Sequence, residues 1–188
     1  MHNHINNPEL FEILEIEKKK KILRYIKWNE SVVLNSAHCL QIDLGSCTSV
    51  VFCGLDSKNV LWFGINHLFK GRDENVDVAL KHISTMISTL KGHGVENIKC
   101  LGLFGAGYKE NSPAKRIAKL NVLSIIETLS LFDMDIEVFQ TGFSQGLIIV
   151  KSDDRDSIII SNKNINSKDI SIIEVPLNKL FCSPSAVQ

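Results

Sequence analysis

Short runs of Val, Ile, Leu and Phe follow one another along most of this chain, and their succession is the strongest constraint on its fold. Such runs, bounded by Gly, Asp, Asn and Ser, are typical of β-strands. The expected strands span residues 40–44, 49–55, 59–69, 97–104, 135–140, 146–151, 157–161 and 170–175. The sequence therefore predicts a protein built mainly from sheet.

Two segments break this series with apolar residues at helical spacing. In residues 76–94, "VDVALKHISTMISTLKGHG", Asp77 is a candidate N-cap and Gly92 or Gly94 a candidate end. In residues 111–132, Ser112 and Pro113 are typical of a helix start. Grouped strands with two central helices predict an α+β sandwich, mostly antiparallel, with helices layered on it.

The N-terminal segment differs from the rest of the chain. Residues 8–28 begin with a proline and carry apolar residues at helical spacing around a lysine run at 18–21, which indicates an amphipathic helix with a solvated lysine face. We expect a helical extension over 1–30, one domain over 31–176 and a tail over 177–188.

The charge balance argues against some partners. The 188 residues include 21 basic and 21 acidic side chains, which gives a formal net charge of zero. A neutral chain of ordinary composition does not point to nucleic acid or to an anionic membrane. The N-terminus carries no basic start followed by an apolar core, and charges interrupt the apolar stretches, so a soluble cytoplasmic protein is expected.

Five cysteines, at 39, 47, 53, 100 and 182, form no CxxC pair, so reduced thiols are expected. Those at 39, 53 and 100 stand among apolar residues and are expected to be buried as small hydrophobic side chains. A metal site from His38, Cys39, Cys47 and Cys53 fits no known zinc spacing, and no metal or cofactor is predicted.

Cys47 differs from the other cysteines because it follows a Leu-Gly-Ser turn at the start of an expected strand. His67 comes just after a later apolar run, "WFGI". Two adjacent strands could bring the thiol and the imidazole to one rim, where the imidazole could take the thiol proton. Taken alone, the pair favours a second interpretation, in which the two residues occupy unrelated core and surface positions, because a chain with five cysteines and six histidines offers many such pairs.

Several short motifs around this pair occur in a recognisable order. They are "LGSC" at 44–47, "INHLF" at 65–69, "VDVAL" at 76–80, "LFGAG" at 103–107, "IAKLNV" at 117–122 and "TGFSQG" at 141–146. Over residues 40–150 the chain resembles the CheD family of chemoreceptor glutamine deamidases. The resemblance implies an α/β/β sandwich like that of the cytotoxic necrotizing factor deamidases, with Cys47 as nucleophile and His67 as base.

The resemblance also implies further site residues. The family's usual threonine six positions before the cysteine is Gln41 here, whose side-chain carbonyl could accept a hydrogen bond from the imidazole. Backbone N–H groups from Gly45 through Ser46 to Cys47 are expected to stabilise an oxyanion, and the thiol pKa is expected to be lowered. Asn66 could orient a substrate amide, and Phe143 could narrow the cleft.

The implied activity is conversion of receptor glutamine side chains to glutamate with release of ammonia. The alternative is a catalytically weakened adaptor that binds a CheC-type phosphatase or methyl-accepting chemotaxis receptors. A third interpretation is a cysteine hydrolase or crosslinking enzyme that acts on another amide. In the loop from Lys70 to Asn75, Arg72 and Asp73 could form the rim that meets a receptor helix; the same loop could equally be a plain solvated connection.

Overall fold

The computed structural model describes residues 5–45, 47–68, 76–107, 114–142, 145–164 and 167–181. In chain order, the elements are α1 (Pro8–Lys20), β1 (Ile22–Tyr25), β2 (Ser31–Asn35), β3 (His38–Asp43), β4 (Thr48–Leu55), β5 (Leu61–Asn66), α2 (Val76–Gly92), β6 (Lys99–Ala106), α3 (Ala114–Ser130), β7 (Ile136–Gly142), β8 (Gln145–Ser152), β9 (Ser157–Asn164), β10 (Ile170–Pro176) and α4 (Leu177–Phe181).

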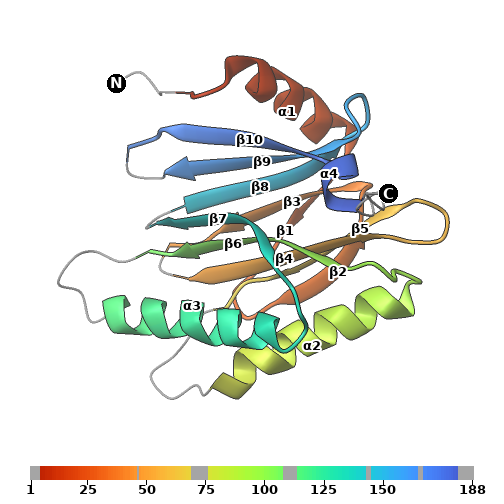
Figure 1. Ribbon diagram of the computed structural model, residues 1–188. Helices are drawn as coiled ribbons and strands as arrows, with labels where there is room; N and C mark the ends of the chain where they lie inside the picture. Colours follow the sequence, from red (N-terminus) through yellow and green to blue (C-terminus); the bar gives the residue numbers. More distant parts are fainter. Residues whose placement is uncertain are drawn as a thin grey trace, which may run out of the picture.

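The strands form two five-stranded mixed sheets. The first sheet has the order β1-β3-β8-β9-β10, and the second has the order β2-β5-β4-β6-β7. The pairs β1–β3 and β6–β7 are parallel, whereas the other pairs between named strands are antiparallel. Figure 1 shows the sheets stacked, with α2 and α3 on the outer side of the second sheet and α1 on the outer side of the first. The expected layered α+β fold is confirmed.

Two main hydrophobic clusters hold these layers together. One lies between the sheets and includes Ile42, Phe63 and Phe104, and the other lies under α2 and α3 and includes Phe52 and Ile83. Strand β4 contributes to both clusters through alternate residues, which explains why its sequence is apolar on both faces. Each fully buried side chain of this size stabilises the fold by about 1.5–3 kcal/mol.

The N-terminal helix is shorter than the sequence predicts. Asn7 caps α1 by accepting a hydrogen bond from the Leu10 N–H, but the helix ends at Lys20 rather than at residue 28. Residues 22–25 instead form β1, which pairs with β3. The helical prediction was wrong there because hydrogen bonding to a strand distant in sequence overrides local periodicity.

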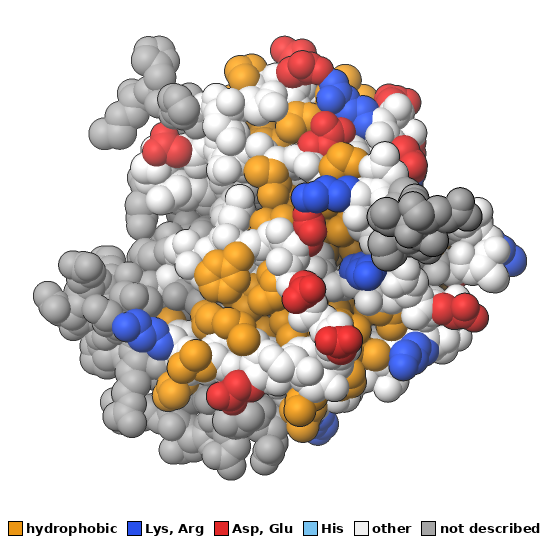
Figure 2. Space-filling view, viewed as in Figure 1, with side chains coloured by type: hydrophobic (Ala, Val, Ile, Leu, Met, Phe, Trp, Pro, Cys, Tyr) orange, Lys and Arg blue, Asp and Glu red, His pale blue; other side chains and the backbone are white. Residues whose placement is uncertain are grey.

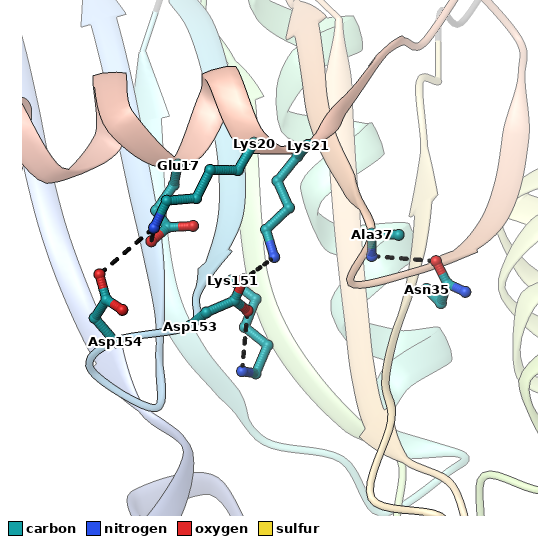
Figure 3. A network of polar contacts seen from close by, with 8 residues as sticks. All are labelled: Glu17, Lys20, Lys21, Asn35, Ala37, Lys151, Asp153 and Asp154. Atoms are coloured by element: carbon teal, nitrogen blue, oxygen red, sulfur yellow. Dashed lines mark hydrogen bonds and ion pairs between the residues drawn. The ribbon is translucent and has the colours of Figure 1, made fainter.

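A polar network fixes the end of α1 to the β8–β9 turn (Figure 3). The Lys21 ammonium lies 2.6 Å from a carboxylate oxygen of Asp153, and Lys20 lies 3.2 Å from Glu17 and 3.5 Å from Asp154. The Lys21 side chain is only 8% exposed. The lysine run is therefore partly an anchor for the helix, and the expectation of a solvated face was wrong for Lys21.

The two central helices agree closely with the prediction. Helix α2 begins at Val76, so Asp77 lies within the first turn rather than at the N-cap. The helix ends at Gly92, and Gly94 has a φ of +81°. Hydrogen bonds from the Gly94 N–H to Lys91 and from the Val95 N–H to Leu90 form a Schellman motif, which explains the need for glycine at this position.

Some features were missed or lie outside the described residues. Strand β2 and the short helix α4 were not predicted, and the strand expected over 59–69 is shorter. Ser112 and Pro113, the expected start of α3, are outside the described residues. Within the part of the chain that the structure describes, no helix is both long enough and apolar enough to cross a membrane.

Candidate functional site

Cys47 lies in the turn that leads into β4. Gly45 has a φ of +48°, and the Leu44 carbonyl accepts a hydrogen bond from the Cys47 N–H, which closes the turn. The Cys47 side chain faces the core between the sheets and is only 5% exposed. Because its N–H already has an acceptor, the structure does not support the expectation that this group stabilises an oxyanion.

Gly105 on β6 supports the same turn. A Cβ atom at this position would lie 2.3 Å from the Cys47 carbonyl oxygen and 3.0 Å from a methyl carbon of Leu44. The glycine also has a φ of +81°. Both the space and the backbone conformation therefore require glycine where β6 passes Cys47.

His67 follows directly after β5 and is fully buried. An isolated antiparallel bridge joins Thr48 to Leu68, with N–H···O distances of 3.0 and 2.8 Å. This register makes Cys47 and His67 diagonal neighbours, whose Cβ atoms are typically about 7–8 Å apart in an antiparallel pair. The two residues that the sequence nominated as nucleophile and base therefore lie at the same end of two neighbouring strands, and no hydrogen bond joins them.

The two ring nitrogens of His67 have different environments. Nδ1 lies 3.3 Å from the Ile26 carbonyl oxygen. Because a carbonyl can only accept, this contact places the proton on Nδ1 and leaves the lone pair on Nε2. Nε2 is buried and has no hydrogen-bond partner among the described residues. The neutral imidazole therefore accepts a proton at Nε2.

Gln41 does not orient the imidazole. On β3, Leu40 and Ile42 point into the core between the sheets, whereas Cys39 points toward α1. Side chains alternate along a strand, so Gln41 lies on the outer face with Cys39, away from His67. The group that contacts Nδ1 is instead the Ile26 carbonyl, and the Ile26 N–H donates to the Gln41 carbonyl at 2.9 Å. A main-chain acceptor occupies the role that the sequence assigned to a side chain.

Burial controls the protonation of the pair. It raises the pKa of the Cys47 thiol to about 11, opposite to the lowering that was expected. It also lowers the pKa of His67, an effect that the Ile26 hydrogen bond and the charge of Asp43 oppose. At neutral pH the pair in this structure is a neutral thiol beside a neutral imidazole.

Asn66 has a structural contact. Its side-chain oxygen accepts a hydrogen bond of 2.8 Å from the Val50 N–H, in place of a ladder bond between β4 and β5. Its side-chain nitrogen is buried without a partner among the described residues. Thr48 Oγ1 and Ser49 Oγ are also buried without a hydrogen-bond partner among the described residues. Unpaired buried polar atoms are rare and costly. Of these atoms, Ser49 Oγ and His67 Nε2 belong to the face between the sheets, whereas Thr48 and Asn66 alternate to the face toward α2.

The remaining predicted site residues lie outside the described part of the chain, and the other cysteines are buried. Ser46, Phe143 and the loop from Lys70 to Asn75, with Arg72 and Asp73, lie outside the described residues. The described cysteines, at 39, 47, 53 and 100, are buried and free, which confirms the prediction for 39, 53 and 100. No group of three or more His, Cys, Asp or Glu side chains in the described ranges is placed to hold a metal ion.

A cavity of about 250 Å³ lies at the start of β6 and β7, between these strands and α4. Its lining includes Lys99, Asp133, Glu137 and Lys179, but neither Cys47 nor His67. This cavity is therefore separate from the thiol–imidazole pair.

Comparison with known proteins adds no assignment to this geometry. No protein-family model matches the chain, and no curated protein matches it.

Three features of the site were missed from the sequence. The Ile26 carbonyl is a backbone atom and leaves no sequence signal. The steric need for Gly105 depends on how closely β6 passes Cys47. Ser49 gave a weak signal, since it is a hydroxyl residue two positions after the candidate nucleophile, just before the apolar run 50–53.

Proposed function

We propose that this protein is a cytoplasmic glutamine deamidase of methyl-accepting chemotaxis receptors, with the α/β/β sandwich of the CheD family. The observation that supports this best is the state of His67, whose Nδ1 contacts the Ile26 carbonyl and whose Nε2 lone pair is unpartnered one diagonal position from Cys47. A thiol and a basic imidazole nitrogen are the minimum for nucleophilic attack on an amide.

The proposed reaction proceeds through a thioester. His67 Nε2 takes the Cys47 proton, and the sulfur attacks the carboxamide carbon of a receptor glutamine. The imidazolium then returns the proton to the amide nitrogen, the C–N bond breaks and ammonia leaves. Water adds to the thioester carbon, which releases glutamate and restores the thiol.

The protonation states give this mechanism a specific form. Because burial keeps both groups neutral, His67 acts as a general base during attack and no preformed thiolate is stored. A site with a buried thiol also requires local opening before a receptor helix can reach it. Both features predict slow turnover in the absence of a partner that opens the site.

A deamidation assay with a matched cysteine control tests the proposal. Receptor cytoplasmic fragments are incubated with wild type, Cys47→Ala or Cys39→Ala, and the mass change at glutamine is measured. Cys39 is also buried with a pKa raised by burial to about 11, but it faces α1. We expect loss of activity in Cys47→Ala alone. Equal activity in all three proteins would show that Cys47 is not the nucleophile.

A second candidate function is that of an adaptor, and the surface favours it. Figure 2 shows hydrophobic side chains gathered on the face where β7 and α3 lie. Large apolar side chains of these elements are exposed, namely Leu120, Leu123, Ile126 and Phe139. An exposed apolar patch of this kind is typical of a protein interaction site. The adaptor would bind a CheC-type phosphatase or the receptor through this patch.

Binding measured together with turnover separates the two functions. A pull-down with a CheC-type phosphatase and with receptor fragments compares wild type with Leu123→Glu, which places a charge on the exposed patch. Binding that is lost in Leu123→Glu, without turnover in wild type, supports the adaptor. Binding with turnover supports the deamidase, and wild type that neither binds nor turns over either partner contradicts both.

A further inference from the structure

The faces of β4 and β5 bring a third polar residue to the pair. The register that joins Thr48 to Leu68 also joins Val51 to Ile65, and it places Ser49 directly opposite His67. Directly opposed residues of an antiparallel pair have Cβ atoms about 4.5–5.5 Å apart. Ser49 is therefore within hydrogen-bonding reach of the imidazole after a side-chain rotation.

Ser49 shares the face of Cys47 as well. Along β4, odd-numbered positions point between the sheets, as Val51 and Cys53 do, and on β6 the residue opposite Ser49 is Phe104, which belongs to the same cluster. Ser49 thus lies between Cys47, which stands two positions earlier in the turn before β4, and His67, which lies across the ladder. Cys47 and His67 themselves are only diagonal neighbours.

The hydrogen-bonding state of these atoms is unusual. Ser49 is fully buried, yet its Oγ has no partner in the described part of the chain, and neither has His67 Nε2. A hydroxyl can donate one hydrogen bond and accept another at the same time. Ser49 Oγ and His67 Nε2 can therefore join a series of hydrogen bonds from the thiol through the hydroxyl to the imidazole without breaking an existing hydrogen bond.

We propose that Ser49 is a proton relay between Cys47 and His67. The thiol proton passes to Ser49 Oγ while the hydroxyl's own proton passes to His67 Nε2, which leaves a thiolate, an intact hydroxyl and an imidazolium. The reverse transfer restores the neutral pair. The proton transfer itself is argued from the geometry of the three residues. Its role in glutamine deamidation rests on the proposed function.

Other titratable groups near His67 bear on the test. Asp43 on β3 acts on it through its charge, and Cys47 lies one diagonal position away, in the turn before β4. From the other neighbouring elements, the Glu30 carboxylate is paired with Arg24, and His82 on α2 is hydrogen-bonded to Ser31 at 2.6 Å. None of these groups is changed by a substitution at Ser49, so a change in proton transfer reports on the hydroxyl.

The test measures the alkylation of Cys47 by iodoacetamide as a function of pH, with peptide mass spectrometry to identify the labelled cysteine. A positioned proton-transfer group typically accelerates a reaction by about 10²–10⁴-fold. We expect Ser49→Ala to slow Cys47 alkylation at pH 7 at least about tenfold, because the thiolate–imidazolium state loses the hydrogen bonds of the bridging hydroxyl and is less populated. As the pH rises, the thiol ionises without this bridge and the rate should approach that of wild type.

Two controls isolate the relay. Ser152→Ala removes another fully buried hydroxyl without a described partner, on the face of the first sheet toward α1, and should leave the profile unchanged. In a His67→Leu background, Ser49→Ala should have no further effect, because the relay has lost its acceptor. Thermal unfolding of each variant confirms that it is folded, and if His67→Leu does not fold, His67→Gln replaces it.

The outcomes distinguish this inference from the proposed function. An unchanged profile in Ser49→Ala, or an equal slowing in the His67-substituted background, overturns the relay. Absence of ammonia release by wild type overturns the deamidase but leaves the alkylation profile to decide the relay. A pH-dependent slowing that requires His67 supports it in either case.

Discussion

Gly105→Ala tests how closely β6 supports the Cys47 turn. The new Cβ atom would lie 2.3 Å from the Cys47 carbonyl oxygen, a distance at which backbone must move. The positive φ adds about 1–2 kcal/mol for an L-residue, and relief of the overlap adds about 1–3 kcal/mol. We therefore expect the free energy of unfolding to fall by about 2–5 kcal/mol.

Gly94→Ala is the matched control for this change. Gly94 has the same φ of +81°, but an added Cβ there meets no atom within 4 Å. It should therefore lose only the backbone contribution of about 1–2 kcal/mol. The difference between the two variants isolates the overlap with the turn.

Urea unfolding of wild type and both variants, analysed by linear extrapolation, gives the two free-energy differences. The Cys47 alkylation rate of the folded Gly105→Ala protein reports whether the turn has moved, and Gly94→Ala should match wild type in that rate. Equal destabilisation of the two variants, with an unchanged alkylation rate, would refute the close-packing argument.

Three further changes test the contacts around the site and the helix anchor. Asn66→Ala removes the acceptor of the Val50 N–H and should cost about 1–3 kcal/mol, with faster amide hydrogen exchange at Val50; unchanged exchange would contradict the bond. Lys21→Met should cost about 1 kcal/mol or less at neutral pH, because its partner Asp153 is half exposed. The pKa of Asp153 is lowered chiefly by its hydrogen bond to Lys21. The loss of stability caused by Lys21→Met should therefore disappear in acid, where the Asp153 carboxylate is protonated. A loss of stability that persists in acid would exclude the ion pair. Burial lowers the pKa of His67, so on acidification the unfolded chain binds a proton that the folded chain does not, and wild type should lose stability as the pH falls below about 6.5. His67→Leu should lack this loss in urea titrations at different pH values. Parallel pH profiles of the two proteins would argue against a neutral buried imidazole.

Local patterns were sufficient for the elements whose stability depends on one continuous face. The apolar periodicity of α2 places its buried residues, such as Ile83 and Leu90, under one side of the helix, and its end at Gly92 was predicted. The predicted strands agree for the same reason, since alternate residues of β4 supply two cores. The placement of Cys47 and His67 at the same end of neighbouring strands also followed from sequence, because each flanks one of two strands that pair, whereas their roles as nucleophile and base stay a prediction.

Tertiary structure decided what depends on partners distant along the chain. The sequence of residues 22–25 suits a helix, but the free backbone groups of β3 make it a strand. That strand carries the Ile26 carbonyl to His67, while the alternation of β3 turns Gln41 to the outer face. The sequence by itself determined the layered α+β architecture and the chemical types at the site. Only the packing of one sheet on the other determined which acceptor meets the imidazole and how far burial shifts the two pKa values, because both depend on atoms that no local pattern specifies.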